Sequence, residues 1–277
     1  MSTAIRIAIA GAGGRMGRTL TRMAAADLTA ADLTAGFKVV GGTERAGAPE
    51  LGLDLGVLAG LDALGAVALP GATDAARDAD VWIDFTTPAA TLTTLDQLRT
   101  TAIKAAIVGA TGFTPEQDAA VAAHATRIAI VKTTNFSLGV NLLAGLIEQA
   151  AQRLGPEWDI EISETHHRRK IDAPSGTALT MGEAAARGRG GKLAELRSPP
   201  YDGITGARAA GRIGFAVSRA GGVIGDHEAR FVSDEEILSL GHRALYRAVF
   251  ARGALHAARW AAGQTSGLYT MRDVLSL

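Results

Sequence analysis

The 277-residue sequence contains no cysteine. Disulfides, thiolate metal ligands and a cysteine nucleophile are therefore excluded. Their absence fits a reducing compartment, and we expect a cytoplasmic protein. Long apolar runs are also missing, because no stretch approaches the ~18 residues that a membrane-spanning helix requires. The opening residues lack the basic segment and apolar run of a secretory signal. We expect no membrane partner.

The sequence also lacks an excess of either charge, since 28 basic residues balance 28 acidic ones. A neutral chain has no general attraction for nucleic acid, and the 5% of aromatic residues are not interleaved with a basic patch. We therefore expect no nucleic-acid partner. Hydrophobic residues make up 47% of the chain and charged residues 20%, which excludes wholesale disorder. The length suits one large or two ordinary domains.

Short apolar runs alternate with helix-like segments in the first half of the chain. The runs are rich in Val, Ile and Ala and contain no polar alternation, which is typical of strands buried on both faces of a parallel sheet. This alternation predicts an α/β domain with a doubly wound, Rossmann-type parallel sheet. The predicted strands are residues 5–10, 37–40, 81–85, 105–108 and 128–131, and the predicted helices are residues 16–26, 89–99 and 115–124.

The pattern changes after residue 136. A helix is predicted over 142–154, where Gly155-Pro156 ends it. Residues 160–164 then alternate apolar and polar, as do parts of 212–218, 223–231 and 236–240. Period-two alternation predicts a half-exposed antiparallel or mixed sheet, and so a second, α+β domain. On these patterns alone, the last apolar helix, residues 247–262, could belong to either domain.

A glycine-rich turn follows the first predicted strand. Gly11, Gly13, Gly14 and Gly17 open the first predicted helix. Glycine permits close approach of the backbone to a pyrophosphate, and the N–H groups of a helix start attract its charge. The spacing is one residue longer than the usual dinucleotide fingerprint, and Met16 occupies the place of the third glycine. We interpret the turn as a dinucleotide site, although plain turn chemistry is an alternative in a chain with 34 glycines.

A dinucleotide site also needs an acid about 20 residues further on, to bind the adenosine ribose. Glu44 follows the second predicted strand and lies 27 residues after Gly17. The sequence AADLT occurs twice in tandem, at 25–29 and 30–34, and without one copy the spacing is 22. We interpret the repeat as an insertion. Arg45 could bind a 2′-phosphate, whereas a solvated surface pair is the alternative for Glu44 and Arg45.

A basic segment in the second half carries the most specific signal. The five residues 166–170 (HHRRK) can all be positively charged. Histidine suits general acid catalysis near neutral pH, and lysine supplies a point charge or a proton. Ser175-Gly176-Thr177, at a predicted helix start, offers donors for a carboxylate. A solvated basic loop is the alternative. We expect no metal, because adjacent histidines diverge and no third ligand has a diagnostic spacing.

Four segments together closely resemble the 4-hydroxy-tetrahydrodipicolinate reductase (dihydrodipicolinate reductase) family, whose members act in the bacterial diaminopimelate route to lysine. They are GAGGRMGR at 11–18, VGATGF at 108–113, TNFSLGVN at 134–141 and ETHHRRKIDAPSGTA at 164–178. The resemblance continues to MRDVL at 271–275. It implies reduction of 4-hydroxy-tetrahydrodipicolinate, a small cyclic dicarboxylate, to tetrahydrodipicolinate by NADH or NADPH. The family's Gly-Glu-His segment is Gly225-Asp226-His227 in this sequence.

The resemblance also implies individual roles. His166 matches the family's general acid, Lys170 its proton donor or substrate-polarising group, and Glu44 and Arg45 its ribose and 2′-phosphate contacts. Substrate carboxylate contacts fall on His167, Gly176 and Thr177. The other implied cofactor contacts are Gly11, Ala12, Gly13, Gly14, Arg15 and Met16 at the pyrophosphate, and Gly109, Ala110, Thr111, Thr133, Thr134, Asn135 and Phe136 near the nicotinamide.

Family members are typically homotetramers, with the C-terminal helix packed on the nucleotide domain. The resemblance therefore implies a dinucleotide domain of residues 1–136 plus 247–277, and a substrate-binding and oligomerisation domain of residues 137–246. Another two-domain NAD(P)-dependent reductase of a small carboxylate would share the glycine turn but not the histidine segment. A binding module without turnover would have lost His166 or Lys170, and both are present.

Overall fold

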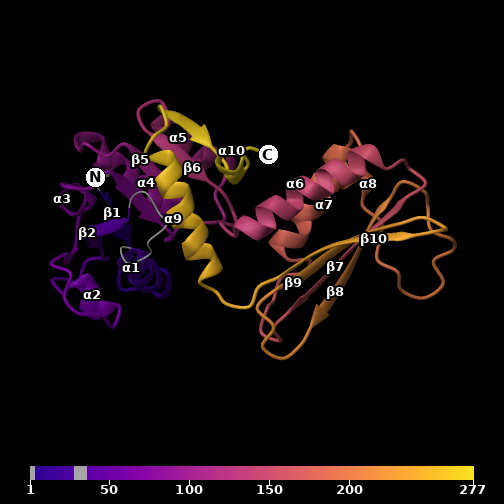
Figure 1. Cartoon of the computed structure of the whole chain (residues 1–277), viewed down its shortest axis with the longest axis horizontal. Helices are drawn as coiled ribbons and strands as arrows, with labels where there is room; N and C mark the ends of the chain where they lie inside the picture. Colours follow the sequence, from indigo (N-terminus) through magenta and orange to yellow (C-terminus); the bar gives the residue numbers. More distant parts are fainter. Residues whose placement is uncertain (1–3, 28–35) are drawn as a thin grey trace. The chain divides into compact units, whose positions relative to one another are not determined.

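The computed structural model describes residues 4–27 and 36–277, and Figure 1 traces them. The chain divides into two compact units. The first consists of the residues up to Phe136 together with Ala248–Ser276, and the second is formed by Ser137–Arg247 with Leu277. Most of the AADLT repeat, from residue 28 onward, lies outside the described residues.

The first unit is built on a seven-stranded, entirely parallel sheet of order β3-β2-β1-β4-β5-β6-β11. The strand order reverses between β1 and β4, as in doubly wound folds. The predicted α/β, Rossmann-type class is thereby confirmed. β4 and β5 are buried at every position, which explains why all their residues except Asp84 are apolar. The strands are β1 (Ile5–Ala10), β2 (Phe37–Thr43), β3 (Ala68–Leu69), β4 (Val81–Asp84), β5 (Ala105–Val108), β6 (Ala129–Lys132) and β11 (Gly267–Tyr269).

Helices cover the parallel sheet. The predicted start of α5 is confirmed, because Thr114 and Gln117 form a reciprocal capping box and Pro115 is the first helical residue. The C-terminal helix α9 belongs to the first unit and packs on β4, β5 and β6 through a row of alanines. The helices are α1 (Arg15–Asp27), α2 (Leu55–Leu58), α3 (Ala72–Ala75), α4 (Pro88–Gln97), the 3-10 turn η1 (Leu98–Thr100), α5 (Pro115–His124), α9 (Val249–Ala261) and α10 (Met271–Leu275).

The second unit contains a mixed four-stranded sheet of order β10-β9-β7-β8, in which only β7 and β8 are parallel. The predicted mixed sheet is thereby confirmed. Two helices pack against each other and share a core with one face of the sheet. The elements are α6 (Leu138–Arg153), β7 (Asp159–His166), α7 (Gly176–Gly188), α8 (Leu193–Leu196), β8 (Ile213–Arg219), β9 (Asp226–Val232) and β10 (Ile237–Arg243).

Strand β7 places both apolar and polar side chains in that core. Its burial alternates, so that Ile160, Ile162, Glu164 and His166 are buried while their neighbours are half-exposed. The first two contribute to the apolar core, whereas the last two bring a carboxylate and an imidazole inside. A buried polar pair at the end of an otherwise apolar face needs partners, and these define the site.

The predicted start of the helix after residue 136 is wrong. Helix α6 begins at Leu138 rather than at residue 142, because the Ser137 side chain accepts the N–H of Val140 and caps the helix earlier. Within residues 4–27 and 36–277, no helix is both long and apolar enough to cross a membrane.

Candidate active site

The glycine turn connects β1 to α1. Gly11 has a positive φ of 60°, and the N–H of Ala12 donates to the carbonyl of Thr43 at the end of β2 (3.0 Å). A Cβ at Gly17 would lie 2.4 Å from the Gly11 carbonyl oxygen and 2.6 Å from the Ala12 Cα. Gly17 thus allows α1 to pack closely on the turn, which is the task of the last glycine in a dinucleotide fingerprint.

The structure brings Glu44 to this turn. Its Oε1 accepts the N–H of Gly13 at 2.8 Å, although the two residues are 31 positions apart. Beside them lies a cavity of about 460 Å³, a volume suited to a small ligand. Arg45 lines it and is exposed. The other lining residues are Ala10, Gly11, Thr43, Glu44, Pro70, Ala72, Thr86, Thr87, Ala90, Thr93, Thr94 and Gln97.

Two further predicted segments follow β5 and β6, at the carboxyl edge where ligands bind to such sheets. Gly109 directly follows β5, and its N–H donates to the carbonyl of Asp84 (2.8 Å). Phe136 is only 1% exposed, and its ring lies 5.3 Å from that of Phe85. Its side chain therefore belongs to the core beneath these loops, while Thr133, Thr134 and Asn135 are partly accessible.

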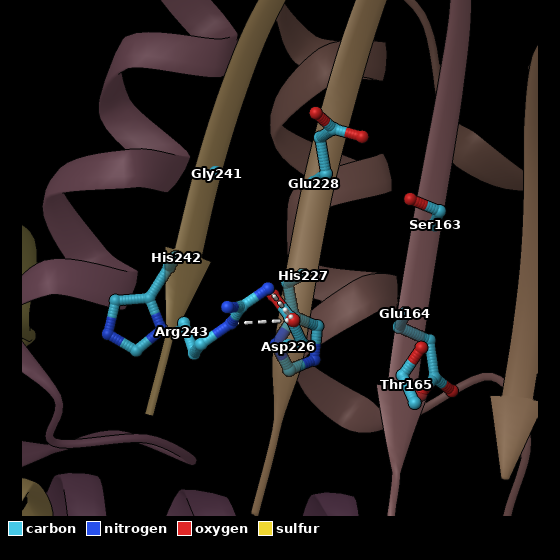
Figure 2. A pocket seen from close by; sticks show the side chains of 9 residues that line it. All are labelled: Ser163, Glu164, Thr165, Asp226, His227, Glu228, Gly241, His242 and Arg243. Atoms are coloured by element: carbon cyan, nitrogen blue, oxygen red, sulfur yellow. Dashed lines mark hydrogen bonds and ion pairs between the residues drawn. The ribbon is translucent and has the colours of Figure 1, made fainter. Parts of the chain in front are cut away.

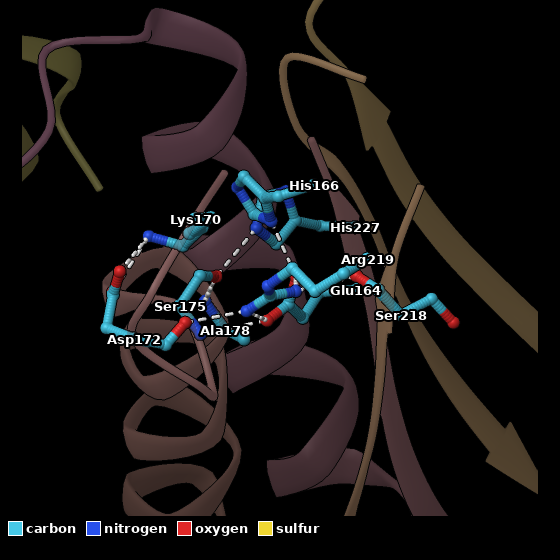
Figure 3. Close-up of polar contacts among 9 residues, drawn as sticks. All are labelled: Glu164, His166, Lys170, Asp172, Ser175, Ala178, Ser218, Arg219 and His227. Atoms are coloured by element: carbon cyan, nitrogen blue, oxygen red, sulfur yellow. Dashed lines mark hydrogen bonds and ion pairs between the residues drawn. The ribbon is translucent and has the colours of Figure 1, made fainter. Parts of the chain in front are cut away.

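In the second unit, the end of β7 places His166 beside a buried carboxylate (Figure 3). Its Nδ1 lies 2.5 Å from Glu164 Oε2. Arg219 donates to both carboxylate oxygens of Glu164, at 2.9 and 3.0 Å, and the Ser175 N–H donates to Oε1 at 3.0 Å. Burial works against ionisation, but hydrogen bonds from Arg219, His166 and Ser175 lower the pKa of Glu164 below its usual value. Glu164 is therefore a carboxylate at neutral pH.

Ser175 connects this group to α7 and to a second histidine. Its Oγ caps α7 by accepting the Ala178 N–H at 3.1 Å and lies 3.0 Å from His227 Nε2. The His227 ring meets that of His166 edge-on, with 4.9 Å between centroids. Burial, followed by the nearby His166, lowers the pKa of His227 to about 4. His227 is therefore neutral at physiological pH.

This neutral histidine predicts acid sensitivity of the second unit. Unfolding exposes His227, which then titrates near 6.5, so protons favour the unfolded chain between pH 6.5 and about 4. Above pH 6.5 His227 is neutral in both states and this effect is absent. Acidification from pH 6.5 to below about 4 lowers the free energy of unfolding by a total of about 3 kcal/mol. Urea unfolding across this pH range should show that His227→Gln flattens the decline in unfolding free energy. An unchanged decline would contradict the assignment.

The remaining predicted substrate residues lie on the loop that leads to α7. Lys170 Nζ is 2.8 Å from both carboxylate oxygens of Asp172. His167 is half-buried, and a Cβ at Gly176 would meet no atom within 4 Å. The space beside Gly176 at the first turn of α7 is therefore open. The amide groups of this turn, which includes Thr177, can attract an anion there.

A second hollow of about 470 Å³ lies on strands β7, β9 and β10 (Figure 2). Arg243 and Asp226 form an ion pair there, with 2.6 Å between Nη2 and Oδ2. Neither His166 nor Lys170 is among its lining residues, which are Ser163, Glu164, Thr165, Asp226, His227, Glu228, Gly241, His242 and Arg243. Glu164 and His227, which both contact His166, do line it.

Comparisons with known proteins place both parts of the chain in one group. Residues 5–136 match the family model "Dihydrodipicolinate reductase, N-terminus", and residues 139–275 match "Dihydrodipicolinate reductase, C-terminus". A 4-hydroxy-tetrahydrodipicolinate reductase of Parvibaculum lavamentivorans is 50% identical over 278 residues and covers 100% of both chains. One from Methylocella silvestris is 48% identical, over 99% of this chain and 97% of the relative.

Among solved structures, the fold is similar to that of "Dipicolinate bound Dihydrodipicolinate reductase from Paenisporosarcina sp. TG-14". The TM-score is 0.72 at 22% sequence identity, and the match covers 96% of this chain and 97% of the other. This likeness concerns the fold of the whole chain.

Proposed function

Because the chain belongs to the dihydrodipicolinate reductase family, we propose that it reduces 4-hydroxy-tetrahydrodipicolinate to tetrahydrodipicolinate with a nicotinamide nucleotide. This is an oxidoreductase reaction of the diaminopimelate route to lysine. The observation that carries the proposal is the placement of His166, held by Glu164, beside the start of α7. A proton donor next to an anion site suits a dicarboxylate that must be protonated on carbon.

The proposed chemistry needs both a hydride and a proton. When bound, the reduced nicotinamide supplies the hydride to C4 of the cyclic conjugated imine, and water leaves the 4-hydroxy compound before or with this step. An enamine-like substrate intermediate then requires a proton at C3. His166 is the donor in this proposal, since imidazole exchanges protons near neutral pH.

Positive charge and helix amides hold the substrate in this proposal. Lys170 provides an ammonium group, and Gly176 and Thr177 present the first turn of α7 to a carboxylate. His167 contributes a second imidazole to the same loop. These groups stabilise the negative charge that develops on the intermediate. Because they are held in place, they do so more strongly than the same groups in a solvated loop.

The first unit binds the nucleotide in this proposal. Its turn suits a pyrophosphate because Gly11, Gly13 and Gly14 place no side chain between the backbone and a ligand. The Glu44 carboxylate, which accepts the Gly13 N–H, lies at the ribose end of the turn in this proposal. Residues 109–111 and 133–135 follow β5 and β6 at the same carboxyl edge, and in this proposal they contact the nicotinamide, with the buried Phe136 beneath them. We propose that both NADH and NADPH are used, in a cytoplasmic homotetramer.

Cofactor choice is expected to depend on Glu44 and Arg45. The Glu44 carboxylate can accept hydrogen bonds from both ribose hydroxyls of NADH but repels the 2′-phosphate of NADPH, which Arg45 attracts. These effects oppose each other, so we expect less than about a hundredfold bias in kcat/KM, or roughly 2.7 kcal/mol. Glu44→Ala should weaken NADH and spare NADPH. Arg45→Ala should mainly weaken NADPH, and less so in high salt.

Steady-state kinetics with both cofactors at two ionic strengths would measure these effects. Glu50→Ala is a matched control, because Glu50 also lies beside Gly13 but pairs with Arg18 at 3.8 Å. It should leave the ratio between the cofactors unchanged. Equal changes for both cofactors in the Glu44 and Arg45 variants would show that this pair is not the ribose site.

The overall proposal is tested by supplying the substrate from the preceding synthase and following oxidation of NADH or NADPH by absorbance. Oxidation should require the synthase product. Oxidation with an unrelated carboxylate substrate alone would favour another two-domain reductase. Nucleotide binding without turnover on either would favour a binding module.

A further inference from the structure

One buried carboxylate contacts both halves of the proposed substrate site. Glu164 is 3% exposed, and its Oε2 faces His166 while its Oε1 accepts the Ser175 N–H. Arg219 donates to both oxygens from the neighbouring strand β8. A planar guanidinium fixes a carboxylate in two directions at once, so Glu164 cannot rotate without losing several bonds.

The contact with Glu164 determines the state of the His166 ring. An ionised carboxylate only accepts hydrogen bonds, so Nδ1 must carry a proton, and Nε2 is the nitrogen left for proton exchange. A Cβ at Gly225 would lie 3.1 Å from this Nε2. Glycine at position 225 therefore keeps the approach to Nε2 clear, and Glu164 keeps the ring facing that way.

The same carboxylate also fixes the start of α7. Through its N–H, Ser175 is bound to Glu164, and through its Oγ it caps the helix at Ala178. The first turn of α7 is therefore held at a set distance from the His166 ring. Catalytic groups work best when their mutual geometry exists before the substrate binds.

Arg219 compensates for the burial of the Glu164 charge. A carboxylate with no cationic partner would be destabilising at this burial. Arg219 also donates to the carbonyl of Asp172 at 2.7 Å, which ties the substrate loop to the same group. The cluster of Glu164, Arg219 and Ser175 is thus a connected frame around His166.

We propose that Glu164 is a positioning residue for the reduction, which fixes both the proton-exchanging nitrogen of His166 and the distance from that ring to the start of α7. The inference rests on the proposed function, because it assumes that His166 is the proton donor. It assigns Glu164 no contact with the substrate.

Kinetics of Glu164→Gln test the proposal. We expect kcat to fall at least about 10- to 100-fold, the range for loss of a carboxylate that orients a metal-ligating histidine, with the Kd for NADPH unchanged. Glu161→Gln is the matched control, since Glu161 also lies on β7 and pairs with an arginine, Arg208, at 3.0 Å but points to the other face. It should retain kcat. Wild-type kcat in Glu164→Gln, or an equal loss in Glu161→Gln, would overturn the proposal.

A spectroscopic measurement avoids reliance on a variant that fails to fold. In the full-length wild-type chain with ¹⁵N-labelled histidine, Nδ1 of His166 should be protonated, its signal being assigned by its absence in His166→Gln. An unprotonated Nδ1 would overturn the inference whatever the variants do. Full turnover in His166→Gln would instead remove the proton donor from the proposed function, so the two failures are distinguishable.

Discussion

Replacing His166 with glutamine is expected to lower turnover by roughly 10²- to 10⁴-fold, the usual range for loss of a general acid. Glutamine has a similar size and can still hydrogen-bond to Glu164, but its amide cannot deliver a proton near neutral pH. Circular dichroism and NADH titration should therefore resemble those of the unaltered protein. The measurement is steady-state turnover with saturating NADH and synthase-supplied substrate.

The control for His166→Gln is Arg168→Gln. Arg168 belongs to the same basic segment but is exposed, and its backbone N–H donates to the Gly221 carbonyl at 3.2 Å. It should leave turnover near that of wild type. If both variants behaved alike, or if His166→Gln kept near-normal turnover, the segment would be a solvated basic loop.

Much of the fold could be predicted because its strands are short apolar runs buried on both faces. The segment at 105–108 carries this pattern without interruption, and in the segment at 5–10 only Arg6 departs from it. Very short elements escaped prediction. Strand β11 has only three residues, and its pairing with β6 defines it. Helix α2 depends on Asp54, whose carboxylate accepts the N–H groups of Gly56 and, ten residues away in sequence, Leu64. The pairing of β11 and the contact with Leu64 have no local sequence signal.

Helix α10 is a different kind of omission, because its signal was present. Thr270 and Asp273 form a capping box, and the pattern Thr-x-x-Asp before an apolar segment is visible in the sequence.

The candidate site likewise contains residues that the sequence predicts and residues that only the fold brings together. His166, Lys170 and the Ser175-Gly176-Thr177 start of α7 could be found from residue type and order, as could Glu44 once the tandem repeat was discounted. The cationic partner of Glu164 could not. Arg219 is 55 residues away and is one of many arginines, and only the parallel register that pairs it with His166 brings it to the carboxylate. His227 had a weak signal in the Gly225-Asp226-His227 segment, but its contact with Ser175 depends on β9 folding beside β7.

Lys170→Ala is expected to weaken the binding of dipicolinate, a stable aromatic dicarboxylate, by about 10- to 150-fold, since a hydrogen bond to a charged group contributes about 1.5–3 kcal/mol. The Lys170 side chain is 20% exposed, and Asp172 holds its ammonium group at 2.8 Å. The ammonium group is therefore in position before the ligand binds. It can still offer a proton or a positive charge to a carboxylate of the ligand. Calorimetric titration with dipicolinate in the presence of NADH would measure the loss.

The matched control is Lys192→Ala, because Lys192 is an exposed lysine of the same unit and its side chain does not cap α8. An exposed charge acts on a distant ligand only through screened interactions, so this variant should change the affinity little, and less still at high salt. Titration of both variants with NADPH would separate a damaged substrate site from a damaged cofactor site. If Lys170→Ala weakened dipicolinate no more than Lys192→Ala, the Lys170 ammonium would be a solvated charge paired with Asp172, and the substrate carboxylates would be held by the start of α7 without it.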